Sequence, residues 1–387
     1  MGEIMRSENF FYLFAFLMEI CIVMASFALP LFAIRLGASV FQLGLMGSGS
    51  ALCYTLGSIC LGQLSDILGR KRILFVGCLS FGALTGIITF ADSVGEVILL
   101  CMLSSGVSMA LFWPPFEAWI ADSRVDSALT DALGKFNVAW SIGAFIGPLV
   151  GGFLFKIDYW LPLCATALLS FCVAGALLSF SPEKGSEFEK RWSNDQNPDQ
   201  KSSGGTFLHI AWMANFVSFF AVGIVRNLFP KLAVHLGMDS RTLGLLMAVL
   251  AFSQAWTFFL LKRNPSWQYR LKPIVAIQLL TALAMSLMLF FNSLVFFGVA
   301  FFLLGANLAT GYSASIFCSL HRQAKKGQMS GLHEAILGMG FLTGPILGGL
   351  VAKYFGLRAP YLLCGVVILA AIALEILSMK HKVCSDR

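Results

Sequence analysis

The sequence predicts an all-helical polytopic membrane protein with twelve transmembrane helices, arranged as two pseudo-symmetric six-helix bundles. The composition is too apolar for an ordinary soluble domain, with 58% hydrophobic residues, 12% charged residues and a mean hydropathy of +0.80. Twelve stretches are long and apolar enough to cross a bilayer, which takes about 20 residues per helix. Two patterns from the first half recur in the second. We therefore expect two copies of one module with six spans each.

The duplication rests on two patterns whose internal spacing is preserved. The first recurs after 197 residues: Gly143, Gly147, Pro148, Gly151 and Gly152 return as Gly340, Gly344, Pro345, Gly348 and Gly349. The second recurs after 200 residues: Pro30, Ala33, Leu36, Gly37, Leu43, Gly44 and Leu45 return as Pro230, Ala233, Leu236, Gly237, Leu243, Gly244 and Leu245. Many transporters are built from such repeats and bind their substrate between them, so the duplication favours a transporter.

The expected elements follow in chain order. The N-terminal bundle, residues 1–180, contains the spans 10–34, 41–64, 73–91, 96–120, 133–156 and 160–180. Residues 181–206 are polar and rich in Ser, Gly and Pro, which predicts a flexible cytoplasmic linker. The C-terminal bundle, residues 207–387, contains the spans 207–234, 242–262, 272–291, 294–319, 328–354 and 360–379. The first span is too long, and is followed by too many others, for a cleaved signal peptide.

The placement of Lys and Arg predicts that both termini are cytoplasmic. With the N-terminus inside, 20 of the 27 basic residues fall on the cytoplasmic side, in accordance with the positive-inside rule. This bias accounts for the net charge of +7, so the charge gives no reason to expect nucleic-acid binding. The ten cysteines lie nearly all within spans and predict no disulfide framework. We expect a monomer in the lipid bilayer of a prokaryotic cell membrane.

The loop after the second span carries a glycine, an aspartate and a basic cluster. Gly62 and Asp66 are four residues apart and share a helix face, while Gly69 allows a sharp turn. Three cations follow directly: Arg70, Lys71 and Arg72. This pattern, between spans two and three of a duplicated twelve-span chain, resembles the signature loop of the major facilitator superfamily, and the resemblance covers essentially the whole sequence.

The resemblance implies a gating role for this loop. Asp66 would latch the two bundles together in one conformation by facing the N-terminus of the eleventh helix, near Ser330, where the helix dipole favours a carboxylate. The alternative is a topological anchor with no gating role. The corresponding loop of the second half, residues 262–273, lacks both the Gly and the Asp.

The glycine pattern of the fifth span predicts close helix packing. Gly143, Gly147 and Gly151 are spaced by four residues and form a smooth stripe, and Pro148 is expected to bend or weaken the helix, as is Pro345 in the second copy. The first copy resembles the pattern that marks the antiporter branch of the superfamily, which favours export. Generic tight packing between the bundles would explain the same glycines.

Acidic residues inside spans are costly and are therefore usually functional or paired. Of the twenty Asp and Glu residues, only four lie within spans: Glu19, Glu117, Glu334 and Glu375. Glu19 lies about halfway into the first span, eleven residues before Pro30. The superfamily's drug–proton antiporters have an acidic residue in this helix ahead of an Ala-Leu-Pro sequence, so Glu19 resembles a proton or cation site. A buried structural ion pair is the alternative.

The other three acidic residues differ in their surroundings. Glu117 follows a Trp-Pro-Pro sequence, which predicts a kink near the cytoplasmic end of the fourth span. Glu334 lies two turns into the eleventh helix, and the repeat places it at the position of Asn137 in the fifth. Such a polar pair would line the cavity or hold the cytoplasmic gate. Glu375 is expected in the last turn of the twelfth helix, reaching the membrane interface, and is assigned no role.

Three further positions bear on substrate and coupling. Arg226 lies about 12 Å inside the outer end of the seventh span, where it would bind an anionic substrate, pair with Glu19 or snorkel outward. Trp140 is a candidate for stacking on an aromatic solute, or for anchoring at the interface. The superfamily's proton antiporters usually have an Arg where this chain has Met102, so their usual proton relay is not implied.

The function expected from these observations is secondary active transport by alternating access. No nucleotide-binding loop, metal-ligand cluster or catalytic triad is present, so we expect neither an enzyme nor a cofactor and take a proton gradient as the energy source. The first expectation is proton-coupled export of hydrophobic or amphipathic small molecules. The alternatives are an uptake symporter for a small organic anion or metabolite, with Arg226 as its anchor, and a non-transporting receptor on a transporter fold.

Overall fold

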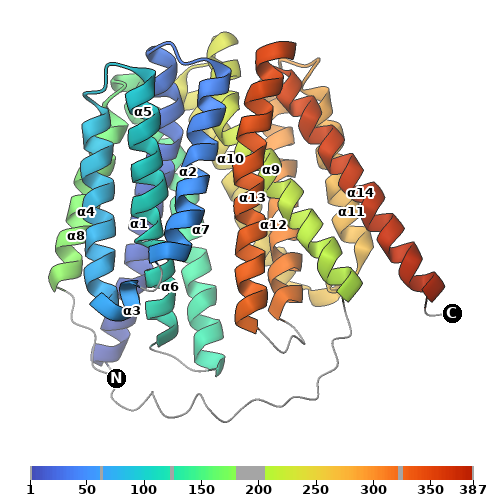
Figure 1. The fold of residues 1–387 in the computed structure, drawn as a ribbon, viewed down its shortest axis with the longest axis horizontal. Coiled ribbons are helices and arrows are strands. Elements are labelled where there is room, and N and C mark those ends of the chain that lie inside the picture. The colour runs from blue at the N-terminus through green and yellow to red at the C-terminus, as the bar shows by residue number, and fades with distance from the viewer. Residues whose placement is uncertain (1, 62–63, 123–125, 180–204, 321–325, 386–387) are drawn as a thin grey trace.

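The helices of the computed structural model form two groups that stand side by side, with both chain termini at the same end (Figure 1). The structure describes residues 2–61, 64–122, 126–179, 205–320 and 326–385. The predicted linker, 181–206, therefore lies almost wholly outside the described residues, and only its last two residues belong to a described helix. We refer to the end that carries the termini as the terminal end.

The N-terminal half contains the helices α1 to α8. Their bounds are α1 Gly2–Arg35, α2 Val40–Leu61, α3 Leu64–Leu68, α4 Arg70–Ile88, α5 Val94–Cys101, α6 Trp113–Asp122, α7 Asp126–Ile157 and α8 Leu161–Ser179, with a π-helix at Met102–Ser108. Within this half, α1 packs on α7 and α8, and α4 packs on α8.

The C-terminal half contains the helices α9 to α14. Their bounds are α9 Gly205–His235, α10 Ser240–Arg263, α11 Leu271–Leu287, α12 Leu294–Leu320, α13 Lys326–Phe355 and α14 Ala359–Ser385, with a 3₁₀ turn at Pro265–Trp267. Here α9 packs on α13 and α12, and α10 packs on α12. The pairing of α9 with α13 repeats that of α1 with α7, as expected for duplicated modules.

The prediction of an all-helical membrane protein is confirmed, and the described residues contain no strand. Eleven helical spans in the described part are long and apolar enough to cross a membrane. The remaining predicted span, 272–291, is the shorter apolar helix α11, which has 17 residues. The predicted kink in the fourth span is present as a turn at residues 111–112, after which α6 begins at Trp113. Pro114 and Pro115 lie in the first turn of α6, where a missing N–H costs nothing.

The second sequence repeat has a local structural cause, because it encodes the end of a helix. Gly37 and Gly237 both have a positive φ, of 90° and 73°. After each glycine the next amide donates back into the helix, Ala38 to the Ala33 carbonyl and Met238 to the Ala233 carbonyl, both at 2.9 Å. This is the C-terminal capping motif that favours glycine. The repeat therefore preserves the same sharp turn at the same end of both halves.

Candidate functional site

Two helix pairs join the halves at the end of the molecule opposite the termini. These are α2 with α13, the α2–α13 seam, and α7 with α10, the α7–α10 seam (Figure 1). At the first seam a Cβ on Gly44 would overlap the Pro345 carbonyl oxygen, and at the second a Cβ on Gly244 would overlap the Pro148 carbonyl oxygen. Backbone therefore meets backbone at both seams, which only glycine permits.

The two seams are equivalent contacts, because each pairs one sequence repeat with the other. Gly44 and Gly244 are copies of each other, and so are Pro148 and Pro345. The glycine of one half lies on the Gly-Pro pattern of the opposite half in both cases. Each sequence repeat therefore contributes one side of a contact whose other side comes from the other repeat. We call this end of the molecule the closed end.

Polar and charged contacts cover the closed end. Lys156 and Asp239 form an ion pair across the α7–α10 seam with an N···O distance of 3.9 Å. The Ser240 hydroxyl donates to the Gly152 carbonyl at 2.9 Å, and the Lys231 ammonium donates to the Ala38 carbonyl at 2.8 Å. Each contact joins one half to the other, so opening this end breaks all three.

A cation also lies over an aromatic ring at each seam. Arg241 lies 5.2 Å from the ring centroid of Phe153, and Lys353 lies 5.9 Å from that of Phe41. The 200-residue shift relates Phe41 to Arg241, and the 197-residue shift relates Lys353 to Lys156, the other cation of the closed end. Such contacts are worth about 0.5–1 kcal/mol when exposed.

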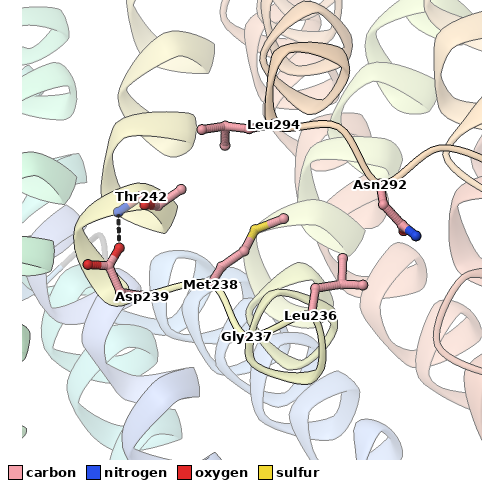
Figure 2. Close-up of a pocket in the computed structure, with 7 residues that line it drawn as sticks. All are labelled: Leu236, Gly237, Met238, Asp239, Thr242, Asn292 and Leu294. Carbon is pink, nitrogen blue, oxygen red and sulfur yellow. Dashed lines mark hydrogen bonds between the residues drawn. The ribbon is translucent and has the colours of Figure 1, made fainter.

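Asp239 also begins α10, where its carboxylate accepts the Thr242 amide at 2.9 Å (Figure 2). This hydrogen bonding, with a smaller contribution from Lys156, holds the pKa of Asp239 below its ordinary value. A surface pocket of about 580 Å³ adjoins it, lined by Leu236, Gly237, Met238, Asp239, Thr242, Asn292 and Leu294. The pocket is broadly open to solvent and belongs to the closed end rather than to the interior.

The glycine stripe of α7 packs on α1 of its own half. A Cβ on Gly143 would lie 2.9 Å from the Cβ of Glu19, and one on Gly147 would lie 3.1 Å from the Cβ of Val23. Gly151 continues the stripe against Phe27. The matching glycines of α13, Gly340, Gly344 and Gly348, pack on α9 in the same manner. The pattern therefore has two faces, one that fixes α7 to α1 and one, through Pro148 and Gly152, that forms the seam.

Glu19 and Arg226 face each other from opposite halves. Glu19 lies on α1 and is only 9% exposed, and Arg226 lies on α9 and is partly buried. Their charges are close enough to interact. Among the described residues, neither side chain has a recorded hydrogen bond or an ion pair within 4.0 Å. The predicted partners are thus near one another without a direct bond.

A second group of polar side chains lies between the halves and consists of Glu117, Glu334, Tyr54 and Tyr312, from α6, α13, α2 and α12. We call this group the inner acidic cluster. The two carboxylates interact electrostatically with each other, and each also interacts with both tyrosines. Glu117 is exposed, and 55% of the Glu334 side chain is accessible. Each half therefore contributes one acidic side chain with accessible surface to this cluster.

Asn137 and Trp140, which were also predicted to line the cavity, are bonded to each other. The Trp140 indole donates to the Asn137 side-chain oxygen at 3.2 Å, a bond within α7. Trp140 also packs against a small apolar cluster formed by Val23, Ala144 and Ala251. The structure brings Glu334 toward Glu117, and it records no contact of Glu334 with Asn137 within the described chain.

The expectation for Glu375 is wrong. The side chain is fully buried, because α14 continues to Ser385 and Glu375 is not in its last turn. The Gln278 amide of α11 donates to one oxygen of Glu375 at 3.0 Å. The sequence reasoning treated the end of the apolar stretch as the end of the helix, and it overlooked the single Gln of α11 as a partner.

The gating motif is described in part. Gly62 and the side chain of Asp66 lie outside the described residues, so the proposed latch is not placed by the structure. Gly69 has a φ of 90° and precedes α4. Arg70 donates to the Ser65 hydroxyl at 2.5 Å, Lys71 donates to the Leu178 carbonyl at 2.8 Å, and Arg72 is exposed. Helix α13 begins at Lys326, four residues before the expected start at Ser330.

Sequence reasoning missed His333, which is fully buried beside Glu334. Its Nδ1 lies 2.7 Å from the Ser315 hydroxyl of α12. The adjacent His-Glu pair inside a predicted span was the available signal.

Comparisons with known proteins agree with this architecture. The model of the Major Facilitator Superfamily matches residues 11–208 and 211–381. Multidrug resistance protein 1 of Bacillus subtilis is 25% identical over 349 residues, covering 85% of this chain and 87% of its own. Quinolone resistance protein NorA of Staphylococcus aureus is 23% identical over 372 residues, covering 92% of each chain.

Two solved structures are similar in fold. The occupied, inward-facing bacterial homologue of the human lysosomal transporter Spinster has a TM-score of 0.78 at 17% identity, covering 96% of each chain. The nucleoside transporter NupG has a TM-score of 0.70 at 13% identity, covering 96% of this chain and 99% of its own. At these identities the likeness concerns the fold alone.

Proposed function

Because this chain belongs to the Major Facilitator Superfamily and is a membrane transporter rather than an enzyme, we propose that it exports hydrophobic or amphipathic small molecules in exchange for protons. The observation that carries the proposal is the buried Glu19, which lies opposite Arg226 between the two halves. The names of the relatives, a multidrug resistance protein and a quinolone resistance protein, support export and an apolar substrate class.

The arrangement of contacts supports alternating access. The two seams hold the halves together at the closed end, while Glu117 and Glu334 are accessible nearer the terminal end. With the termini in the cytoplasm, as the distribution of basic residues predicts, this conformation would admit substrate from the cytoplasm. Rocking the halves would part the glycine seams and release the substrate outside. The two proposed latches, the seams and the Asp66 loop, would then stabilise opposite conformations.

Proton coupling is assigned to Glu19 because it is an acidic group at the interface of the halves with an opposite charge across from it. A carboxylate attracts a guanidinium strongly in a medium of low dielectric constant, and a protonated carboxyl does not. Protonation of Glu19 would therefore weaken the attraction between α1 and α9. One proton crossing about 150 mV supplies about 3.5 kcal/mol, enough for a solute gradient of a few hundredfold.

The test is a survival assay in efflux-deficient bacteria exposed to a panel of toxic compounds. Cells would express the wild type, Glu19→Gln, Glu375→Gln or no transporter. Glu375 is the matched control, because it is also a buried acidic residue in a span but bonds Gln278 away from Glu19. We expect protection by the wild type and by Glu375→Gln, and loss of protection with Glu19→Gln. Protection that survives Glu19→Gln would contradict the assignment of the proton site.

The second candidate function is uptake of a small organic anion. It is favoured by Arg226, for which no hydrogen bond or close ion pair is recorded in the described part of the chain, so that its guanidinium is available to a carboxylate or phosphate. In the same assay an uptake system would make some compounds more toxic. Sensitisation that Arg226→Gln abolishes would support this function and refute export.

A further inference from the structure

The strongest feature outside the proposed Glu19 site is the buried imidazole of His333. Its side chain is 0% exposed, and its Nδ1 lies 2.7 Å from the hydroxyl of Ser315, which is also fully buried. The ring of Tyr312 meets the imidazole edge-on, with the centroids 4.9 Å apart. The ring is therefore held in position by α12, and Nδ1 is hydrogen-bonded to the serine.

The other nitrogen of His333 lacks a hydrogen bond. In the described part of the molecule Nε2 is buried and has no hydrogen-bond partner. It lies 3.8 Å from a carboxylate oxygen of Glu334, about 1 Å longer than an N–H···O bond. A buried polar nitrogen without a hydrogen bond lowers the stability of the folded protein. The question is therefore why Nε2 lies beside a carboxylate without bonding to it.

The protonation of the ring offers an explanation for the 3.8 Å separation. If Nδ1 carries the ring proton and donates it to Ser315, then Nε2 presents a lone pair to the carboxylate, and two acceptors face each other. Two acceptors do not approach to hydrogen-bond distance, which accounts for the 3.8 Å separation. One added proton would convert this gap into a charge-assisted hydrogen bond.

We propose that His333 and Glu334 together form a proton-exchange site on the C-terminal half. The accessible carboxylate of Glu334 takes a proton from hydronium in the aqueous phase, which becomes water, and passes the proton to Nε2 of His333. The products are an imidazolium and a carboxylate, with Nδ1–H still donating to Ser315. No other bond changes, and the proton returns to water by the same route. His333 acts here through Glu334, as the buried store for a proton that the carboxyl exchanges.

The titratable groups that face the pair are Tyr312 of α12, Tyr54 of α2 and Glu117 of α6. A proton on His333 would neutralise the charge of Glu334, whose carboxylate oxygen lies 3.8 Å from Nε2. As far as transport is concerned, the inference rests on the proposed function, because only a transporter would couple this neutralisation to the movement of a solute.

The experiment is ¹⁵N NMR of the full chain in detergent micelles, with ¹⁵N-labelled histidine and without a polyhistidine tag. The chain has five histidines, and His333→Gln identifies the resonances of interest. In the wild type we expect Nδ1 to be the protonated nitrogen at high pH, and Nε2 to become protonated as the pH is lowered. Ser315→Ala should move the high-pH proton toward Nε2, whereas Ser315→Thr, which keeps the hydroxyl, should not.

The decisive variant is Glu334→Gln, with Glu117→Gln as the matched control from the opposite half. At the pH where half of His333 is protonated in the wild type, we expect no more than about one tenth to be protonated in Glu334→Gln, because a carboxylate at this distance contributes at least a tenfold effect. Glu117→Gln should change this fraction by less than about threefold, because charge interactions weaken with distance.

Two results would overturn the proposal. One is a His333 that stays neutral down to pH 5 in the wild type, and the other is an equal effect of the two glutamine variants. The measurement needs no substrate, so it stands or falls separately from the survival assay. A pair that titrates in a protein that moves no compound would leave the proton site in place and remove the proposed function.

Discussion

Adding one methyl group at Gly152 should loosen the closed end of the molecule. Gly152 lies on α7 at the α7–α10 seam, and a Cβ there would lie 2.5 Å from the Ser240 carbonyl oxygen. Ordinary contact begins at 3.4 Å, so the two helices must separate by most of an ångström. Overpacking of this kind costs about 1–3 kcal/mol. If the cost falls only on the closed conformation, Gly152→Ala raises the population of the open one by about 5- to 150-fold.

Two further glycines give a graded comparison. Gly349 lies at the equivalent position of the α2–α13 seam, but its nearest neighbour, the Val40 carbonyl oxygen, would be 3.1 Å from a Cβ. Gly175 in α8 would have no atom within 4 Å of its Cβ. We therefore expect Gly152→Ala to raise the population of the open conformation most, Gly349→Ala to raise it less, and Gly175→Ala to leave it unchanged. Gly175→Ala should only stabilise its own helix slightly, because Ala has a higher helix propensity than Gly.

The assay is hydrogen–deuterium exchange of the detergent-solubilised protein, followed by mass spectrometry of peptides from the ends of α2, α7, α10 and α13. The exchange rate of an amide reports the free energy of local opening, so a larger open population should accelerate exchange by about the same factor as the population rises. If the halves move as rigid bodies, as the proposed alternating access requires, Gly152→Ala should accelerate exchange at both seams. Unchanged exchange in Gly152→Ala, or acceleration confined to its own seam, would refute the reasoning.

Three other outcomes are expected. Protonation of Asp239 should weaken the closed end, because the pKa of Asp239 is held low in the folded protein. Its contribution to the free energy of unfolding is complete above about pH 4 and disappears as the pH falls through the folded-state pKa. The wild type should therefore be thermally more stable than Asp239→Asn at neutral pH, and this difference should be absent at acidic pH. Glu375→Ala should lower the free energy of unfolding by about 1–3 kcal/mol, because it leaves the buried Gln278 amide unpaired. Glu375→Gln should keep an acceptor for this amide and so retain stability, and equal losses in the two variants would contradict this. Gly143→Ala should abolish protection in the survival assay as Glu19→Gln does, because its Cβ would lie 2.9 Å from that of Glu19, and full protection would show that the packing does not position Glu19.

The sequence was sufficient for the architecture because membrane insertion is decided by local composition. A helix that crosses a bilayer must be apolar over about 20 consecutive residues, and this property is read without knowledge of the fold. The repeat was equally local: at Gly37 and Gly237 the helix ends through hydrogen bonds between residues three to five positions apart. The wrong expectation for Glu375 also has a local cause, because α14 continues beyond the end of its apolar stretch.

The sequence by itself therefore determined the helices, the duplication and most of the acidic residues worth testing. Only the tertiary structure decided which of these residues meet. Gly44 lies on Pro345, Gln278 bonds Glu375, and His333 lies between Ser315 and Glu334. These partners are separated by 301, 97 and 18 or fewer residues along the chain. Apolar helices pack through shape and a few polar bonds on specific faces, and no periodicity in a uniformly apolar span reveals which face meets which neighbour.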